Sequence, residues 1–523
     1  MNDELDEAAT ARRRQLIEEG RLLTWWAERQ PDRLAIVAPT GTRSFAELDA
    51  AANRLVRALR RRGLVEGDAV ALICGNRPEF AEVVAACQRG GFRLTPVNWH
   101  LSAAEAAYIV EDCQARALLV DATTTDEAIG VARGAPGCEV RLAIGGDVDG
   151  FERYDDAVAV EDGGALDDPV LGHSMLYTSG TSGRPKGVHR PPSSDAAITA
   201  INLFGYDAGR GDVHLCTGPL YHAAPLAFSL AIPLAYGVGV VVMESWDASA
   251  ALALVEEHRV SHTHMVPTMF HRLLSLPPDQ RQQADVSSLR MVLHGAAPCP
   301  IAVKRRLIEW VGPIVWEYYA ATEGTGTFVD SATWLERPGT VGRPMVEDLV
   351  LVGDHEGKAV PVGEVGLVYL KAPRTGRFEY FGDPDKTAGS YRGDYFTLGD
   401  MGYLDEDGYL YLTDRSVNLI ISGGVNIYPA EVDAVLLEHP AVADAATIGV
   451  PDAEWGEQVK AVVELQPGVE ASPELAAELI EHCRAHLAHF KCPRTVDFVD
   501  ELPRQDNGKI YKRLLRDRYR SEV

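Results

Sequence analysis

The chain has 523 residues, 46% hydrophobic and 24% charged, which is ordinary globular composition on a chain too long for one hydrophobic core. Its formal net charge of −26 argues against a nucleic-acid partner and against attraction to an anionic membrane. The eight cysteines include no Cys-x-x-Cys pair, so we expect reduced, buried thiols and neither disulfides nor a structural metal.

The N-terminal sequence, MNDELDEAATARRRQ, is acidic where a secretory signal needs basic residues followed by an apolar run. We therefore expect a cytoplasmic protein. Farther along, Ser44 and Glu47 form a capping box at the start of a helix with one apolar face, which Gly63 ends.

Strand and helix patterns then alternate along the N-terminal part of the chain. Apolar strands are predicted at residues 69–75, 93–98, 116–121, 237–243, 260–267 and 290–298, with helical patterns between most of them. This alternation predicts an α/β fold with parallel sheets covered by helices.

An uncharged stretch at residues 223–243 is long enough to cross a bilayer. Pro233, Gly237 and Gly239 divide it, so we expect a buried helix over roughly 226–236 and then a β-branched strand, with no transmembrane segment. Between residues 340 and 412 the pattern changes to short strands separated by turn sequences, which predicts a β-rich region. Another α/β pattern follows residue 414.

The stretch YTSGTSGRPKGV, residues 177–188, combines backbone freedom, hydroxyl donors and positive charge. Its glycines permit a close approach of the backbone to a ligand, and such a set of donors suits a polyphosphate. It is not a Walker A loop, because no Gly-Lys-Ser/Thr ends it. A plain surface loop is the alternative.

This stretch resembles the phosphate-binding signature of the adenylate-forming superfamily, in its acyl-CoA synthetase branch. Further motifs of that superfamily follow in the same order. They are PLYHAAP (219–225), HGAAP (294–298), EYYAATEG (317–324), DYFTLGD (394–400), the hinge stretch 414–431 and LPRQDNGKIYKRLLR (502–516).

The resemblance implies binding sites for ATP, Mg²⁺ and coenzyme A. It assigns the ATP phosphates to Thr178, Ser179, Gly180, Thr181 and Lys186; the adenine to Gly295, Ala296, Ala297, Pro298, Tyr319 and Ala320; the ribose to Asp400 and Arg415; and coenzyme A to Gly423 and Gly424.

The resemblance also implies four catalytic residues. Lys509 stabilises charge during adenylation, Thr322 donates to the α-phosphate, Glu323 holds Mg²⁺ with Thr178 as a second metal ligand, and His222 gates the acyl pocket. The alternative interpretation is that His222, His264 and His294 are buried core histidines. His264 and His294 are further candidates for the pocket.

The implied architecture is a large N-terminal domain, residues 1–413, of helix-covered sheets with a small β-barrel-like subdomain at 340–412. A smaller, mobile α+β C-terminal domain, residues 414–523, completes it. The implied function is an ATP-dependent acyl-CoA ligase that makes an acyl-AMP from a hydrophobic carboxylic acid and then a CoA thioester. The small domain would turn about Asp414 and Arg415 between the two steps, so that Gly423 and Gly424 replace Lys509.

Three departures from the family pattern leave alternatives open. Val417 stands where the hinge usually carries a charge, Ala320 stands where glycine is usual, and QDNGK stands in place of Thr-x-Thr-Gly-Lys. The alternatives are a partial ligase that only forms the thioester from a preformed acyl-adenylate, an enzyme that loads a carrier protein, and a non-catalytic nucleotide-binding homologue. A homodimer is also left open.

Overall fold

The computed structural model describes residues 7–178, 185–192, 204–344, 350–373, 376–415, 418–422, 425–452, 455–504 and 510–520. Two compact units make up the chain. The first comprises Met1–Met265, Leu276–Val292 and Pro373–Ala388, and the second comprises Val266–Ser275, Leu293–Ala372 and Gly389–Val523. The domain boundary between residues 413 and 414 stays a prediction. Among the described residues, no helix has both the length and the apolar character to cross a bilayer.

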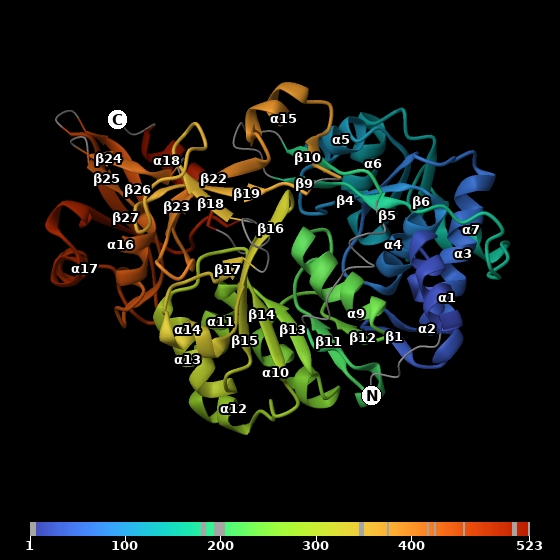
Figure 1. Cartoon of the computed structure of the whole chain (residues 1–523), viewed down its shortest axis with the longest axis horizontal. Helices are drawn as coiled ribbons and strands as arrows, with labels where there is room; N and C mark the ends of the chain where they lie inside the picture. The colour runs from blue at the N-terminus through green and yellow to red at the C-terminus, as the bar shows by residue number, and fades with distance from the viewer. Residues whose placement is uncertain are drawn as a thin grey trace. The chain divides into compact units, whose positions relative to one another are not determined.

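The first unit contains a sheet of parallel strands in the order β7-β6-β5-β3-β4-β8. Figure 1 labels β4, β5 and β6 of this sheet. Its strands are β3 (Ala69–Ile73), β4 (Arg93–Val97), β5 (Ala115–Asp121), β6 (Val140–Ile144), β7 (Glu152–Arg153) and β8 (His173–Ser174). The helices that accompany it are α1 (Glu7–Glu18), α2 (Leu22–Arg29), α3 (Phe45–Arg61), α4 (Pro78–Gly90), α5 (Ala103–Asp112), α6 (Thr125–Gly134) and α7 (Tyr154–Ala159), with the 3₁₀ turn η1 (Ala122–Thr124).

Both faces of β3 are buried, as the continuous apolar run predicts for a central parallel strand. Val70 and Leu72 belong to a core cluster that contains residues of α3 and α4. Ala71 and Ile73 belong to another cluster that contains residues of α5 and α6. Alternate residues of a strand point to opposite faces, so this division places helices on both sides of the sheet. The capping box of Ser44 and Glu47 at the start of α3 is also confirmed.

A second group of strands in this unit follows the order β13-β11-β12-β1-β2. Its members are β1 (Leu34–Ala38), β2 (Gly41–Ser44), β11 (Val213–Cys216), β12 (Gly239–Val242) and β13 (His262–Met265). Nearby in the chain are η2 (Ala208–Arg210), α9 (Ile232–Ala235), α10 (Ala248–Glu257) and α12 (Pro278–Gln283). A smaller sheet joins β20 (Glu379–Tyr380), β10 (Lys186–His189) and β9 (Leu176–Thr178) in that order.

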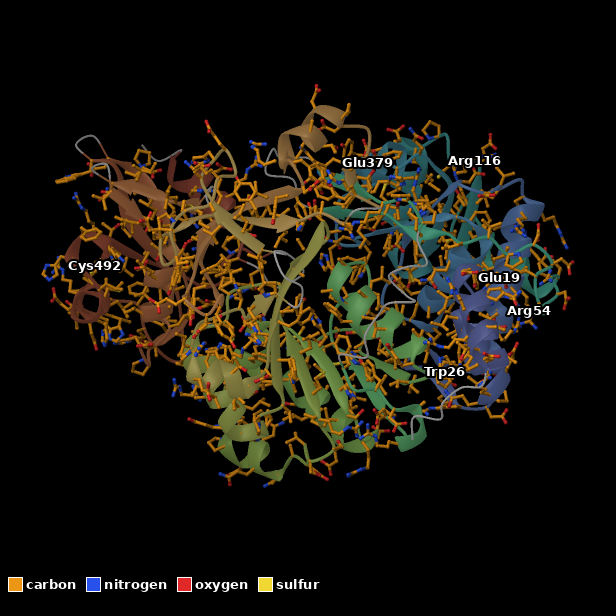
Figure 2. The ribbon with its side chains drawn as sticks, in the orientation of Figure 1. Glu19, Trp26, Arg54, Arg116, Glu379 and Cys492 are labelled. Carbon is orange, nitrogen blue, oxygen red and sulfur yellow. The ribbon has the colours of Figure 1, made fainter. Side chains whose placement is uncertain are left out.

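The uncharged stretch before β12 is helical, as expected, but part of it winds differently from the prediction. Pro225–Ala231 (η3) is a π-helix, and α9 continues it to Ala235. The indole Nε1 of Trp26 on α2 (labelled in Figure 2) donates to the carbonyl of Ala235 at 2.9 Å, which fixes the end of this helix. π-helices are rare and are often found at functional sites.

The second unit carries the strand order β17-β16-β15-β14, followed by a β-rich region of order β18-β19-β22-β21 with β23 paired to β22. The strands are β14 (Met291–His294), whose last two residues belong to this unit, β15 (Val315–Ala321), β16 (Gly324–Val329), β17 (Arg343–Pro344), β18 (Val350–Gly353), β19 (Gly366–Lys371), β21 (Tyr391–Arg392), β22 (Tyr395–Leu404) and β23 (Leu410–Arg415). Its helices here are α11 (Pro267–Leu274), α13 (Ile301–Val311) and α14 (Ser331–Glu336). Short strands are thus found where the sequence predicts them, while the subdomain bounds of 340–412 stay a prediction.

The C-terminal part of this unit is a mixed sheet, β25-β24-β27-β26, with β28 parallel to β27. It comprises β24 (Ile420–Ser422), β25 (Val425–Ile427), β26 (Val442–Asp452), β27 (Gly456–Leu465) and β28 (Thr495–Val499), with α16 (Pro429–Leu436), α17 (Pro473–His486), η5 (His489–Lys491) and α18 (Lys512–Arg520). α15 (Pro384–Ser390) begins in the first unit.

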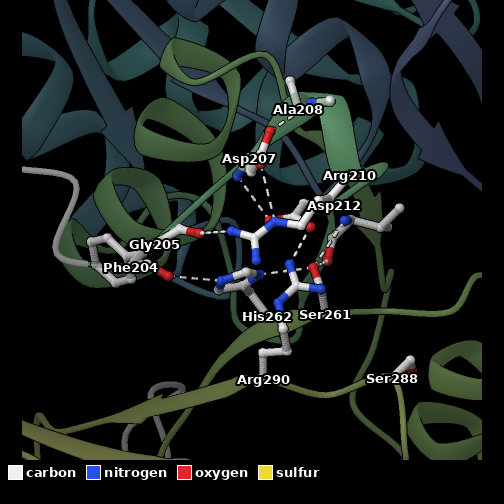
Figure 3. Close-up of polar contacts among 12 residues, drawn as sticks. Phe204, Gly205, Asp207, Ala208, Arg210, Asp212, Ser261, His262, Ser288 and Arg290 are labelled. Atoms are coloured by element: carbon white, nitrogen blue, oxygen red, sulfur yellow. Dashed lines mark hydrogen bonds and ion pairs between the residues drawn. The ribbon is translucent and has the colours of Figure 1, made fainter. Parts of the chain in front are cut away.

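Three buried histidines lie on one face of β11 and β13. His214 and His262 are partners in the parallel register, and His264 follows His262 by two residues, which places its side chain on the same face. The Tyr206 hydroxyl lies 2.8 Å from Nδ1 of His214. The carbonyl of Phe204 lies 2.8 Å from Nε2 of His262 (Figure 3). Burial lowers the pKa of His262 to about 4 and that of His264 to about 3, and lowers the pKa of His214 well below its usual value.

These depressed pKa values predict a loss of stability in mild acid. Below about pH 6.5 the unfolded chain takes up protons that the folded chain excludes, so the stability from neutral burial is complete above that pH and is lost as the pH falls toward about 4. Each histidine contributes a slope of up to about 1.4 kcal/mol per pH unit. We expect His264→Gln to reduce the fall in the thermal unfolding midpoint between pH 7 and pH 5. The exposed His486→Gln is the control, and an undiminished fall in the His264 variant would contradict the expectation.

Candidate functional site

The two ends of the glycine-rich stretch are held opposite each other in the first unit. Thr178 at the end of β9 is the antiparallel register partner of Lys186 at the start of β10. Gly187 packs closely here, because a Cβ at this position would lie 3.2 Å from the Tyr177 ring and the ring would have to shift slightly. Side chains of register partners lie on the same face of an antiparallel pair, so Thr178 and Lys186 lie side by side on one face of the hairpin. A shared phosphate site would require this arrangement.

Side chains of α5 anchor both ends of this hairpin. The Tyr177 hydroxyl donates to Oδ2 of Asp112 at 2.5 Å, and burial together with this carboxylate raises the pKa of Tyr177. The Tyr108 hydroxyl donates to the carbonyl of Pro185 at 3.5 Å. Sequence reasoning missed Tyr108 and Asp112, because their helix lies far from the hairpin in the chain.

Lys186 also contacts the segment that follows β20. Its Nζ lies 3.8 Å from Oδ2 of Asp383 and 5.9 Å from the ring centroid of Tyr380. Its side chain is only 18% exposed, so these neighbours restrict where the ammonium group can lie.

His222 lies in the turn that precedes η3. Its backbone N–H donates to the carbonyl of Pro219, and its own carbonyl accepts from Leu226 inside the helix. Asn76, which follows β3, fixes this turn: its Nδ2 donates to the carbonyl of Gly218 at 2.9 Å, and its Oδ1 accepts from the backbone of Leu220 at 2.9 Å. Asn76 is a further positioning residue that no local sequence pattern indicates.

The second unit carries the stretch expected to line adenine, directly after β14. Gly295 is packed against the next strand, since a Cβ there would lie 2.6 Å from the Tyr318 ring. Ala296 has a φ of 68°, a left-handed conformation that is uncommon for a residue with a Cβ. Ala297 is half-buried and Pro298 is exposed. Strained backbone of this kind is concentrated at ligand sites.

A buried ion pair lies next to this stretch. Nζ of Lys304 on α13 donates to Oε2 of Glu317 on β15 at 2.6 Å, and Nε2 of His294 lies 3.6 Å from the same oxygen. The Lys304 ammonium group lies 4.6 Å from the ring centroid of Trp334. Burial lowers the pKa of Lys304 and raises that of Glu317, so each group depends on the other to remain charged. His294 thus contacts a structural ion pair as well as preceding the predicted adenine stretch.

Tyr319 on β15 contacts Asp400 on β22, a strand of another sheet. The Tyr319 hydroxyl donates to Oδ2 of Asp400 at 2.7 Å. In the backbone register, Asp400 is the partner of Arg415 on β23. Gly326 leaves room for Tyr319, because a Cβ there would lie 2.9 Å from the Tyr319 ring carbon Cδ1. The structure thus joins one residue expected to contact adenine to one expected to contact ribose.

Thr322 and Glu323 form the turn between β15 and β16, since Ala321 pairs directly with Gly324. Ala320 precedes them at the irregular pairing next to Tyr319, and is half-buried. Glu323 is buried. Within the described part of the chain, no three histidine, cysteine or carboxylate side chains gather into a metal site. Mg²⁺ at nucleotide sites uses one or two carboxylates with phosphate and water oxygens, so Glu323 and the Thr178 hydroxyl are suitable donors.

Asp414, the first residue of the predicted hinge, joins β23 to α16. Its Oδ2 accepts from the backbone N–H of Ala430 at 3.1 Å, in the first turn of α16. Its Oδ1 accepts from Nδ2 of Asn418 at 3.2 Å. The amide that follows the unusual Val417 therefore has a partner within the hinge.

Several predicted site residues lie outside the residues that the structure describes. They are Ser179, Gly180, Thr181, Gly423, Gly424 and Lys509, together with Val417.

Comparison with known proteins covers nearly the whole chain. Residues 23–378 match the model for "AMP-binding enzyme", and residues 431–509 match that for "AMP-binding enzyme C-terminal domain". A feruloyl-CoA synthase from Amycolatopsis sp is 34% identical, over 91% of this chain and 94% of its own. A fatty acid–[acyl-carrier-protein] ligase from Streptomyces coeruleorubidus is 33% identical, over 94% of this chain and 95% of its own.

Among solved structures, an anthranilate CoA ligase in complex with anthranoyl-AMP superposes with a TM-score of 0.87 at 26% identity. The match covers 97% of this chain and 98% of that one. It confirms the expected α/β fold with a large N-terminal and a smaller C-terminal domain.

The contact between Tyr319 and Asp400 predicts a selective loss of ATP binding. Tyr319→Phe keeps the ring and removes the donor to Asp400, which leaves that buried carboxylate less well oriented. We expect the Kd for ATP to rise about five-fold to ten-fold, the effect of one hydrogen bond, in isothermal titration calorimetry. Tyr403→Phe, whose ring stacks on Tyr411 on the same sheet, is the matched control. Parental affinity in the Tyr319 variant would argue against the assigned nucleotide contact.

Proposed function

The chain belongs to the AMP-binding enzyme family, as an AMP-forming acid–thiol ligase of the acyl-CoA synthetase branch, and we propose that it acts on hydrophobic, ring-bearing carboxylic acids. The observation that carries the activity is the match of both family models, in order, on a chain that spans nearly the full length of its CoA-ligase relatives. The acid proposal is supported by the side chains around η3.

Aromatic rings gather around η3. Phe228 on this helix lies 5.7 Å from the ring centroid of His264 and 5.8 Å from that of Phe204. The Tyr206 ring lies 5.4 Å from Phe204 and 6.1 Å from Tyr236. Aromatic side chains pack well on other rings, edge-to-face or offset, so this cluster suits an aryl or polycyclic acid. The relatives named for feruloyl and anthranilate substrates support the same class.

The first step joins the acid to AMP. A carboxylate oxygen attacks the α-phosphorus of ATP, the bond to the β-phosphate oxygen breaks, and pyrophosphate leaves. The protein must spread the developing negative charge over fixed donors, and Lys186, Thr178, Thr322 and Lys509 are the groups proposed for this. Asp400 orients the ribose, with its second oxygen already bonded to Tyr319. A bound Mg²⁺, held by Glu323 and Thr178, would neutralise phosphate charge.

The second step moves the acyl group to sulfur. The CoA thiol attacks the acyl carbonyl and AMP leaves. We propose that Arg415 and Asp414 lie at the pivot that brings Gly423 and Gly424 to the acyl-adenylate in place of Lys509. The contacts of Asp414 to Asn418 and Ala430 support a defined pivot, since they hold the chain that follows Asp414.

A carrier protein is the second candidate acceptor, because one relative is a fatty acid–[acyl-carrier-protein] ligase.

The experiment that tests the function is a panel of aryl, polycyclic and fatty acids. Each acid is assayed for pyrophosphate release without CoA, and for AMP release with CoA or with a carrier protein. Absence of pyrophosphate release with every acid, together with thioester formation from synthetic acyl-adenylates, would favour the partial ligase.

Lys509→Ala should separate the two half-reactions. Its ammonium group is proposed to meet the α-phosphate only during adenylation. We expect pyrophosphate release to fall by about 100-fold or more, the usual size of losing a preorganised charge-stabilising donor. Thioester formation from a synthetic acyl-adenylate should stay close to the parental rate. Equal losses in both assays would refute the assigned role.

Gly424→Leu should give the opposite separation. A side chain at this position is proposed to obstruct the pantetheine arm or to distort the glycine turn. Acyl-adenylate should still form and accumulate, while its transfer to CoA should fall at least about ten-fold. Rapid-quench measurement of the bound adenylate checks this. Undiminished CoA turnover would show that this turn does not meet coenzyme A.

A further inference from the structure

A second lysine, Lys386, lies beside the predicted phosphate site of the first unit. β20 pairs antiparallel with β10, with Tyr380 opposite Val188. The backbone N–H of Phe381 donates to the carbonyl of Gly187 at 2.8 Å, which extends the pairing by one residue toward Lys186. The chain after β20 therefore runs back along the phosphate hairpin and brings Asp383 to Lys186.

The turn after β20 fixes the position of Lys386. Oδ1 of Asp383 accepts from the backbone N–H of Lys386 at 3.0 Å. The Thr387 hydroxyl donates to the carbonyl of Asp383 at 2.8 Å and accepts from the backbone N–H of Tyr380 at 2.9 Å. These three bonds tie the start of α15 to the strand that contacts Lys186.

Both lysines contact the same aromatic ring. Nζ of Lys386 lies 4.8 Å from the ring centroid of Tyr380, and Nζ of Lys186 lies 5.9 Å from it. Tyr380 is buried, so its ring is a fixed surface. Both ammonium groups thus lie within about 6 Å of the centre of one ring, and the Asp383 carboxylate accepts from the backbone N–H of Lys386 and lies 3.8 Å from the Nζ of Lys186.

A nearby carboxylate, that of Glu379, has its own partner. Glu379 on β20 (labelled in Figure 2) lies with its Oε1 3.0 Å from Nδ1 of His189. Lysine ammonium groups bind phosphates as mobile point charges, and two of them at one site match an anion with charge on two phosphate groups.

We propose that Lys386 is a second cationic binding residue for the β- and γ-phosphates of ATP and for the pyrophosphate that leaves. This rests on the proposed function of the Lys186 hairpin. Tyr380 and Asp383 act as positioning residues, since they hold both lysines but need not touch the nucleotide. Lys386 then contacts the leaving group and has no part in the thioester step.

The test uses Lys386→Met, which keeps the length of the side chain and removes its charge, and Lys386→Arg, which restores the charge. Lys371→Met is the matched control, because the Lys371 ammonium group lies 5.9 Å from the ring of Tyr395 in a comparable exposed contact on β19. Acid-dependent ATP–pyrophosphate exchange gives the KM for ATP and for pyrophosphate. Synthetic acyl-adenylate with CoA gives the rate of the second half-reaction.

We expect Lys386→Met to raise both KM values about ten-fold or more, the size of a charge-assisted contact, and Lys386→Arg to restore most of the loss. The thioester rate and the Lys371 variant should stay within about two-fold of the parent. Parental KM values in Lys386→Met, or equal losses in both half-reactions, would overturn the proposal.

Direct titration of pyrophosphate into the parent and the Lys386→Met protein separates this proposal from the proposed function. If the parent shows no exchange with any acid, the proposed adenylation step fails. Weaker pyrophosphate binding by the variant would still support the Lys386 site. Equal pyrophosphate binding by the two proteins would refute it, whatever the parent catalyses.

Discussion

The stretches predicted to contact the nucleotide in the second unit depend on one buried carboxylate, that of Glu317. It is held by Lys304 from α13 and lies close to His294, so it joins the helix to the two strands from which the adenine stretch and the Thr322–Glu323 turn leave. A buried charge without a partner costs several kcal/mol, and removing one member of such a pair typically costs about 3–5 kcal/mol. The strands β14 and β15, from which both stretches begin, therefore cannot move relative to α13 without separating these charges.

The predicted phosphate hairpin has a different physical basis. The two strands that flank the Gly-, Ser- and Thr-rich stretch are held by residues elsewhere in the chain: Asp112 accepts from Tyr177 on one strand, Tyr108 donates to Pro185 directly before the other, and β20 pairs with β10. The stretch predicted to bind phosphate and the residues that hold its flanking strands are thus separate, and the second group lies about 65 residues or more away in the chain.

Local patterns predicted the features that short-range physics decides. The continuous apolar run of β3 and the capping box of Ser44 and Glu47 are examples. The π-helical winding of Pro225–Ala231 was not predicted, because its sequence is apolar throughout and gives no periodicity to read. Motif resemblance named Tyr319 and Asp400, but not the bond between them. That bond, like the contacts of Asn76, joins residues far apart in sequence, and only the fold decides which of them meet.

The remaining question is how a chain with a formal charge of −26 holds anionic substrates. Three carboxylates that contact the predicted phosphate and ribose residues or their strands each accept a hydrogen bond. Asp112 accepts from Tyr177, Asp400 accepts from Tyr319, and Asp383 accepts from the backbone of Lys386 and lies 3.8 Å from the Lys186 ammonium group. The dipole of a hydrogen-bond donor partly neutralises the charge of the carboxylate that accepts from it. More distant carboxylates are screened by salt, with a Debye length of about 8–10 Å. The electrostatic potential at the predicted substrate positions therefore depends on local donors more than on the net charge of the chain.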